Sequence, residues 1–97
     1  MISSFGNTLT EYMFNDLKTK NTIKFPPELY RIARRKLMYL SDAESLNDLK
    51  APPGNRLERL KGASIDFYSI RINDQYRIVF KWINSTAHEV TVIDYPK

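Results

Sequence analysis

The sequence contains no cysteine, which excludes disulfide bonds and thiolate ligands for metals. It has no uninterrupted apolar stretch of about 18 residues, so no transmembrane helix is predicted. The opening residues, MISSFGNTLTEY, lack the basic and apolar regions of a signal peptide. Together these absences predict a soluble protein of the cytoplasm.

Glycine and histidine are scarce, with three residues and one residue respectively. The chain has no glycine-rich phosphate loop and no Cys, His and carboxylate cluster with metal-site spacing, so no cofactor and no metal are expected. Its 97 residues suffice for a single domain, 1–97, which at this size buries roughly 60–65% of its unfolded surface. A net charge of +4 favours a polyanionic or acidic partner, without choosing between RNA, DNA and protein.

Three runs rich in Ile, Val, Phe, Tyr and Trp occupy the second half of the chain: Asp66–Ile72, Tyr76–Ile83 and His88–Tyr95. Short polar breaks separate them, which predicts a three-stranded antiparallel meander. Most of their apolar residues are even-numbered, so a single buried face requires even positions opposite even positions. The predicted buried residues are Tyr68, Ile70, Ile72, Tyr76, Ile78, Phe80, Trp82, Val90 and Val92.

Loops of three residues satisfy this register at both breaks. The loop at Asn73–Gln75 places Ile72 opposite Tyr76, and the loop at Asn84–Thr86 places Ala87 opposite Ile83. The only histidine, His88, then begins the last strand on the even face, where we expect a structural or loop-exposed side chain.

The odd-numbered face carries most of the charge of the predicted sheet. Lys81 falls opposite Glu89, which is ordinary cross-strand charge matching. Arg71 falls opposite Arg77, and two like charges side by side are normally unfavourable. Either this pair offers an anion a binding site, or the two long side chains splay into water.

The first half of the chain predicts one short strand and a helix. Met1–Phe5 is a candidate opening strand that joins the sheet later. A helix is predicted over residues 8–19, because Thr8 and Glu11 have capping-box spacing and apolar residues follow at helical intervals. Asn21-Thr22 is expected to end it.

A second helix is predicted to begin at Pro26–Glu28, since proline suits the first helical turn. This helix carries a basic run of Arg31, Arg34, Arg35 and Lys36. The run is either a face exposed to solvent or a binding surface, and in the second case it would contact a nucleic-acid backbone or an acidic partner segment. Leu46–Glu58 is rich in turn residues and predicts a connection without elements. The order of strand, two helices and meander, with the even face packed on the helices, predicts an α+β domain.

Four motifs follow one another at characteristic spacing: LKG at Leu60–Gly62, the strand DFYSIRIN, YRIVFKW at Tyr76–Trp82 and IDY at Ile93–Tyr95. In this arrangement the chain resembles the HigB toxins of bacterial type II toxin–antitoxin pairs, also called plasmid maintenance killer proteins, within the RelE superfamily. The resemblance spans nearly the whole chain and is strongest from Leu60 onward.

The resemblance implies the RelE-like microbial ribonuclease fold and a metal-independent endoribonuclease that cleaves messenger RNA on the translating ribosome. It also implies a cognate antitoxin, HigA, with a helix-turn-helix DNA-binding domain. Among the family's functional residues, Lys61 matches its lysine, Arg77 its arginine in the middle strand, and Asp94 and Tyr95 its terminal pair. Arg71 matches a basic position that is less firmly tied to catalysis.

The end of the sequence departs from this pattern. Many HigB toxins end in Asp-Tyr-His, whereas Pro96 and Lys97 follow Tyr95 here. Either Lys97 takes the place of the imidazole, or Lys61 and Tyr95 suffice as in relatives that work without histidine, or the activity is weak. Lys97 and Lys81 join Arg71 as candidate RNA-binding residues.

The chemistry needs three groups around the scissile phosphate: a base for the 2′-hydroxyl, positive charge for the phosphorane, and an acid for the leaving oxygen. The planar, permanently charged fork of arginine suits the middle role, for which Arg77 is the first candidate and Arg71 the second. Lys61 and Tyr95 are candidate proton carriers, although their reference pKa values are about 10.4 and 10. Neighbouring arginines would lower the pKa of Lys61, and Tyr95, on the odd face, can also stack on a base.

Two other hypotheses compete with the nuclease. A catalytically weak or inactive basic module of the same fold would act only by binding an antitoxin or another cellular target, and the missing terminal histidine favours it. A sequence-specific DNA binder has only the basic second helix in its favour, since the pattern of a helix-turn-helix is absent.

Overall fold

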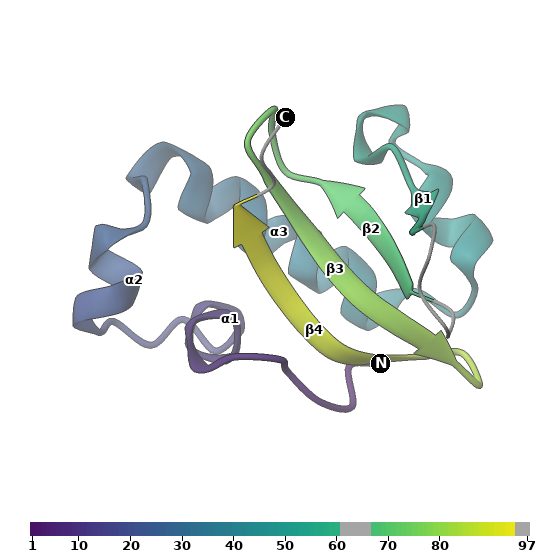
Figure 1. The fold of residues 1–97 in the computed structure, drawn as a ribbon, viewed down its shortest axis with the longest axis horizontal. Helices are drawn as coiled ribbons and strands as arrows, with labels where there is room; N and C mark the ends of the chain where they lie inside the picture. Colours follow the sequence, from purple (N-terminus) through teal and green to yellow (C-terminus); the bar gives the residue numbers. More distant parts are fainter. Residues whose placement is uncertain (61–66, 95–97) are drawn as a thin grey trace.

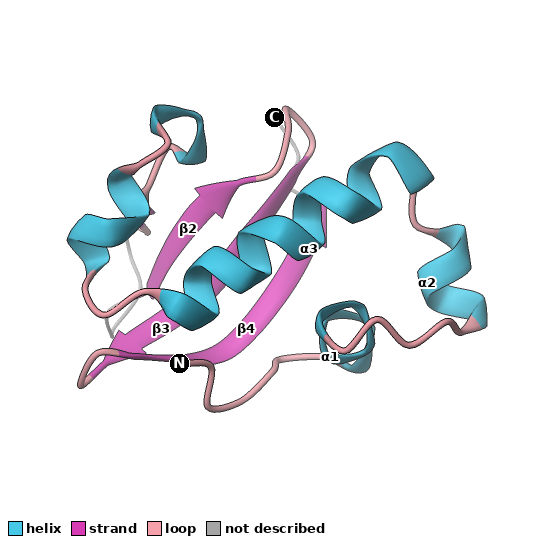
Figure 2. Ribbon diagram, turned by 180° about the vertical axis from the view of Figure 1, so that it is seen from behind, coloured by secondary structure: helices cyan, strands magenta, loops and turns pink. Residues whose placement is uncertain are grey.

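The structure, a computed structural model, describes residues 1–60 and 67–94. The chain forms α1 (Thr8–Phe14), α2 (Lys20–Lys24), α3 (Pro27–Asp42), the 3-10 helices η1 (Leu46–Lys50) and η2 (Pro53–Asn55), then β1 (Glu58–Arg59), β2 (Phe67–Arg71), β3 (Tyr76–Ile83) and β4 (Thr86–Asp94). The four strands make one antiparallel sheet in the order β1-β2-β3-β4. Helix α3 crosses one face of this sheet (Figures 1 and 2). The predicted α+β class is therefore confirmed.

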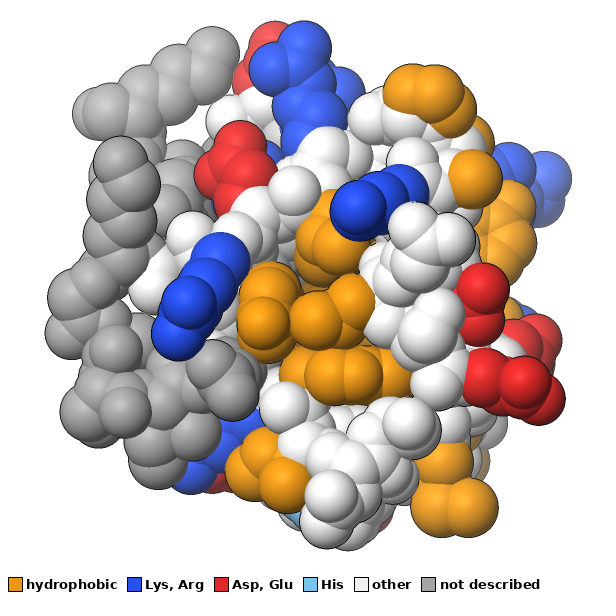
Figure 3. Space-filling view, turned by 90° about the vertical axis from the view of Figure 1, so that its right-hand side faces the viewer, with side chains coloured by type: hydrophobic (Ala, Val, Ile, Leu, Met, Phe, Trp, Pro, Cys, Tyr) orange, Lys and Arg blue, Asp and Glu red, His pale blue; other side chains and the backbone are white. Residues whose placement is uncertain are grey.

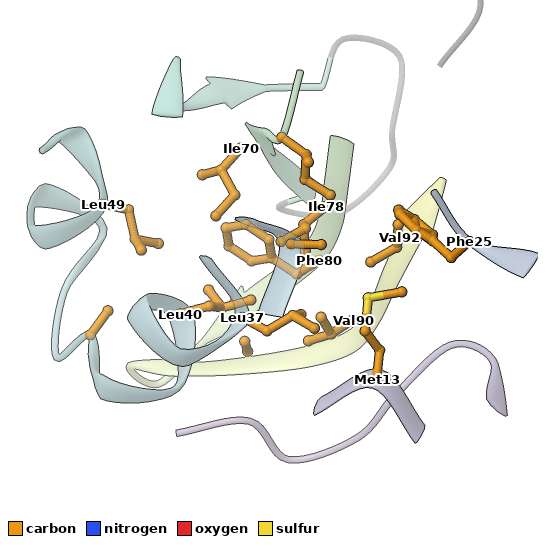
Figure 4. Close-up of a cluster of buried hydrophobic side chains, with 14 residues drawn as sticks. Met13, Phe25, Leu37, Leu40, Leu49, Ile70, Ile78, Phe80, Val90 and Val92 are labelled. Carbon is orange, nitrogen blue, oxygen red and sulfur yellow. The ribbon is translucent and has the colours of Figure 1, made fainter. Parts of the chain in front are cut away.

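The core lies between α3 and the even-numbered face of the sheet. Ile70, Ile78 and Phe80 are fully buried there, as the alternation of the sequence predicts. Leu37 and Leu40 of α3 pack against them, one helical turn apart, and Figure 4 shows these side chains converging. Tyr68, Tyr76 and Trp82 border the cluster and are partly buried.

The hairpin between β3 and β4 differs from the predicted one. Asn84 and Ser85 have positive φ values of 50° and 61° and form a two-residue turn, a geometry that matches the natural twist of paired strands. Ile83 therefore pairs with Thr86, and Ala87 pairs with Trp82, so the predicted three-residue loop is wrong.

A β-bulge corrects the resulting offset. The register shifts between Val79 and Lys81, and Glu89, with φ of 52°, is the irregular residue on β4. One extra residue there restores even-opposite-even pairing, so that Val90 and Val92 return to the core. Before the bulge the parity is reversed, and it is the odd-numbered Ala87 that is buried.

The N-terminal segment covers the outer edge of β4 without forming the predicted strand. Ile2 and Phe5 make isolated parallel bridges to Ala87 and Val90. Between these bridges, the bulged Glu89 donates its backbone N–H to the Ser4 hydroxyl at 2.9 Å, so the backbone ladder is interrupted. The segment still pairs edge groups of β4 that would otherwise be open to another strand.

Gly6 and Thr10 complete this cover. A Cβ on Gly6 would lie 2.0 Å from Thr91 Oγ1, so only glycine fits this close approach. Fully buried Thr10 accepts a hydrogen bond from the Val92 backbone N–H at 2.9 Å, which attaches α1 to β4.

The helix predicted over residues 8–19 is shorter than expected: α1 ends at Phe14, and a separate helix, α2, begins at Lys20. Asn7, rather than Thr8, caps α1, because its side chain accepts a hydrogen bond from the Thr10 backbone N–H at 2.9 Å. Asp16, at φ of 56°, follows the end of α1. Thr19 then caps α2 in a reciprocal capping box with Thr22, so the predicted terminator lies inside a helix.

The segment Leu46–Glu58, predicted as a connection without elements, contains η1 and η2 and ends at the first residue of β1. Ser45 and Asp48 form a capping box at the start of η1. Asn55, fully buried, donates to the carbonyls of Leu49 and Ala51 at 3.2 and 3.3 Å. These contacts bring β1 alongside β2, where Glu58 lies opposite Ser69.

Candidate active site

Figure 1 shows the sheet from the side turned away from α3, here called the distal face. The odd-numbered residues of β2 and β3 lie on this face, because the even-numbered ones pack against α3 and side chains alternate along a strand. Arg71 and Arg77 are direct cross-strand partners on this face, as predicted. Lys81 lies further along β3, one pair beyond the bulge. The distal face therefore holds three of the predicted cationic site residues.

The guanidinium of Arg77 is held in place by neighbouring groups. Its Nε donates to the Ser69 hydroxyl at 2.9 Å, and one terminal nitrogen donates to the Arg56 carbonyl at 2.8 Å. The same nitrogen is 3.9 Å from a Glu58 carboxylate oxygen. The Arg77 side chain is only 11% exposed, so it is a buried cation with matched partners and a defined orientation.

Arg71 turns the other way. Its guanidinium forms an ion pair with Asp74 in the β2–β3 loop and is 30% exposed. The like-charge pair is thus relieved by protein groups, since Arg77 points toward β1 and Arg71 toward the hairpin. Neither an external anion nor two solvated arginines is needed to explain the adjacency.

Lys81 is matched by Glu89, with 2.5 Å between Nζ and a carboxylate oxygen, and Nζ also lies 5.4 Å from the centre of the Phe67 ring. The predicted ion pair is confirmed, although the backbone partner of Lys81 is His88 because of the bulge. Directly opposite residues share a face, so His88 lies on the distal face beside Lys81. The predicted placement of His88 on the even face is wrong for this reason.

The remaining predicted site residues are less fully defined. Asp94 is exposed at the end of β4, opposite Tyr76, and accepts a hydrogen bond from the Gln75 side chain at 3.1 Å. Lys61, Tyr95 and Lys97 lie outside the described residues.

Glu58 is a residue of this site that the sequence reasoning missed. Its side chain is 58% exposed, and its carboxylate faces the Arg77 guanidinium from β1. A two-residue strand leaves no alternation to detect, so the sequence placed Glu58 in a connection. Ser69 is odd-numbered and lies on the distal face, yet it is fully buried and accepts a hydrogen bond from Arg77 Nε.

Lys36 of α3 is the second missed residue. The sequence placed it in a basic run that was either a solvated face or a contact for a nucleic-acid backbone or an acidic partner, yet it is only 7% exposed. Its Nζ donates a hydrogen bond to the Arg71 backbone carbonyl at 2.5 Å. The two residues of β1 pair with Tyr68 and Ser69, so Arg71 lies beyond the end of β1 on this edge of β2. Burial, and then the nearby charges of Arg71, Arg35 and Arg77, lower the pKa of Lys36 below 10.5.

This lowered pKa predicts a pH-dependent stability. The buried positive charge of Lys36 lowers the free energy of unfolding while the group is protonated. Because the unfolded chain binds more protons at Lys36 than the folded chain as the pH approaches 10.5, this destabilising contribution decreases as the pH rises through that range. Urea denaturation over the alkaline range should show the wild type gaining free energy of unfolding relative to Lys36→Met. The exposed Lys50→Met variant serves as the control and should track the wild type. Parallel curves for wild type and Lys36→Met would contradict the prediction.

Within residues 1–60 and 67–94, no group of three or more His, Cys, Asp or Glu side chains could hold a metal ion. No helix in the same ranges is long and apolar enough to cross a membrane.

Helices packed on one face of a four-stranded antiparallel sheet make an α+β fold, which is consistent with a RelE-like protein. The chain belongs to the HigB-like toxin family, the RelE-like toxins of type II toxin–antitoxin systems, whose family model matches residues 3–95. It is therefore a toxin of such a system. The resemblance noted in the sequence and its fold are both confirmed.

Two relatives support this membership. Toxin HigB-1 of Vibrio cholerae serotype O1 is 37% identical over 87 residues, which cover 90% of each chain. An uncharacterized protein of Haemophilus influenzae is 38% identical over 79 residues, which cover 81% of this chain and 74% of that protein.

Proposed function

We propose that this toxin is a metal-independent endoribonuclease that cleaves translated messenger RNA on the ribosome. The 2′-hydroxyl attacks the adjacent phosphorus, the bond from phosphorus to the 5′-oxygen breaks, and the products carry a cyclic phosphate and a free 5′-hydroxyl. The attacking hydroxyl gives its proton to a base, and the leaving oxygen takes one from an acid.

The observation that carries the proposal is the fixed guanidinium of Arg77. A phosphorane is stabilised best by positive charge that is already oriented, because no reorganisation is then needed during the reaction. Ser69 and the Arg56 carbonyl supply that orientation. Arg77 is accordingly the proposed stabiliser of the transition state.

The other predicted residues take the remaining roles. Lys61 and Tyr95 carry the protons, and Asp94 orients a neighbour or takes part in proton transfer. The proposed RNA-binding residues are Arg71, Lys81 and Lys97. Asp74 and Glu89 already pair with the first two, so RNA binding there exchanges one anionic partner for another.

The proposed partners are the ribosome with its messenger RNA, and a HigA-type antitoxin with a helix-turn-helix domain. A protein antitoxin follows from the class of system to which the chain belongs. The HigA type follows from the resemblance to HigB toxins, including the relative named HigB-1.

Mapping of new 5′ ends in cellular messenger RNA after tightly controlled induction tests the proposal. The wild type should arrest growth and produce cuts in phase with codons within translated regions, and Lys61→Ala should lose both effects. The Lys50→Ala variant removes an exposed charge on η1 and should behave as wild type. A folded wild type that produces no such cuts would reject the nuclease.

One observation favours a second candidate, the module that acts only by binding. Each cation that the structure describes on the distal face has an acidic partner nearby: Asp74 for Arg71, Glu58 for Arg77 and Glu89 for Lys81. Such matching is also what a purely structural face would need. Growth arrest without cuts would favour this candidate.

A further inference from the structure

The positive charge of the chain is concentrated in one segment. Residues 16–36 contain seven Lys and Arg and two Asp and Glu, a net charge of +5, whereas the entire chain has +4. The rest of the chain is therefore slightly acidic in sum. This segment forms α2 and the first half of α3, which project beyond the edge of the sheet in both ribbon views (Figures 1 and 2).

Two adjoining hollows run along this segment and together form what is here called the α2–α3 groove. The first, of about 420 Å³, is walled mainly by apolar groups of Ile23, Phe25 and Pro27. Lys18 and Tyr30 line both hollows and join them into one surface.

The second hollow, of about 500 Å³, is the basic half of the groove, with Arg31, Arg34 and Arg35 in its wall. Its one acidic residue, Asp16, already accepts a hydrogen bond from the Tyr30 hydroxyl at 2.7 Å. The second hollow therefore presents an excess of positive charge.

Apolar side chains are unusually exposed at the first hollow. Ile23, which lines it, is 69% exposed. Leu17 does not line the hollow but precedes Lys18, which does, and is 49% exposed. Large apolar groups beside a hollow favour a contact that removes them from water. An RNA backbone would leave such groups uncovered, whereas apolar side chains of a protein segment would bury them.

Arg34, in the wall of the second hollow, has a buried N–H group that lacks a hydrogen-bond acceptor among the described residues. This group, at Nε, is shielded from water. A guanidinium in this situation is suited to a carboxylate, which can accept two parallel hydrogen bonds from it. Arg31 and Arg35 are exposed beside it and complement further acidic groups.

We propose that the α2–α3 groove is the docking site for an acidic, amphipathic segment of the antitoxin. Apolar side chains of that segment enter the hollow beside Ile23, and its carboxylates meet Arg31, Arg34 and Arg35. The proposal rests on the proposed function in one respect, that the chain acts with a protein antitoxin. The groove is separate from the distal face, so antitoxin binding and RNA cleavage can be changed independently.

Among the described residues, the opposite end of the molecule does not combine exposed apolar side chains with an excess of positive charge. Figure 3 shows apolar side chains gathered on the face that carries η1 and η2, but both basic and acidic side chains border them. The hollow there, of about 400 Å³, includes Asp42 and Asp48 in its wall. Charge complementarity therefore selects the α2–α3 groove for an acidic partner.

The test uses the purified toxin and the full-length product of the adjoining gene as the antitoxin. Two variants alter the groove at exposed positions: Ile23→Asp, and the double charge reversal Arg31→Glu with Arg35→Glu. We expect each to weaken the affinity by about 10- to 100-fold, since like charge or a buried carboxylate opposes the acidic segment. The matched control Lys50→Glu reverses an exposed charge on η1 and should stay within about twofold of wild type.

Cleavage of translated messenger RNA is measured on the same proteins. Wild-type cleavage by both groove variants, with growth arrest that the antitoxin no longer relieves, would support the docking site. Unchanged antitoxin affinity, or a wild type that does not bind the product, would overturn it. Unchanged affinity with reduced ribosome binding would instead make the groove a nucleic-acid surface. If the wild type binds the antitoxin but cuts no RNA, the nuclease proposal fails while the affinities still decide the docking site.

Discussion

Replacing Arg77 with alanine is expected to lower the rate of messenger RNA cleavage by about 10²- to 10³-fold, the usual effect of removing one oriented group that stabilises transition-state charge. The guanidinium is oriented by the Ser69 hydroxyl and the Arg56 carbonyl. Water that fills the space left in the alanine variant is neutral and does not replace this oriented positive charge. The rate is measured in single-turnover cleavage of messenger RNA on programmed ribosomes.

Two matched variants separate charge from geometry. Arg77→Lys keeps the charge but loses the planar fork, and should recover only part of the lost rate. Arg35→Ala removes an exposed arginine of α3 and should cleave as wild type. Cleavage by Arg77→Ala within about threefold of wild type would show that Arg77 does not stabilise the reacting phosphate.

The stability of Arg77→Ala has to be measured alongside its activity. The substitution removes the hydrogen bond that Arg77 Nε donates to the buried Ser69 hydroxyl, and it removes a side chain that connects β3 to β1. We expect a loss of about 1–3 kcal/mol in the free energy of unfolding, which a domain of this size tolerates below its melting temperature. Assays at a temperature where the variant is fully folded therefore report catalysis alone.

Replacing Phe80 with alanine should have the largest effect on stability, about 3–5 kcal/mol. Phe80 is fully buried at the centre of the core, between α3 and the sheet (Figure 4). Its ring lies 6.2 Å from the ring of Tyr68 and 6.3 Å from that of Trp82, so both aromatic contacts are lost with it. The free energy of unfolding of a natural domain is about 5–15 kcal/mol, so the expected loss is a large part of the total stability.

Urea denaturation of Phe80→Ala measures this loss against two controls. Phe80→Leu retains most of the volume and should lose less than half as much. Ile83→Ala removes a side chain from the same strand at a position that is 41% exposed, and should lose about 1 kcal/mol or less. Equal stability of Phe80→Ala and Ile83→Ala would contradict the prediction and would mean that neighbouring side chains fill the space left by the Phe80 ring.

Much of the fold was predictable from local patterns. The alternation of apolar residues identified β2, β3 and the buried even-numbered face, because side chains in a strand alternate sides. Paired prolines marked the start of α3. The cross-strand adjacency of Arg71 and Arg77 followed from that same alternation and from the length of one loop.

The β3–β4 hairpin was not predictable in this way. A two-residue turn at Asn84-Ser85 and a bulge at Glu89 cancel one another, so the buried residues beyond the bulge are the same as with a regular three-residue loop. Parity alone cannot distinguish the two arrangements. Only the tertiary structure shows that His88 shares the distal face with Lys81.

By itself, the sequence determined the family of the protein, its α+β class and the residues of its core, because these depend on motif spacing and on periodic burial along the chain. The tertiary structure alone decided the surroundings of the charged groups. Arg77 meets the Arg56 carbonyl 21 positions away, and Lys36 meets the Arg71 carbonyl 35 positions away. Contacts of that separation depend on how the elements pack, and no local pattern in the chain encodes them.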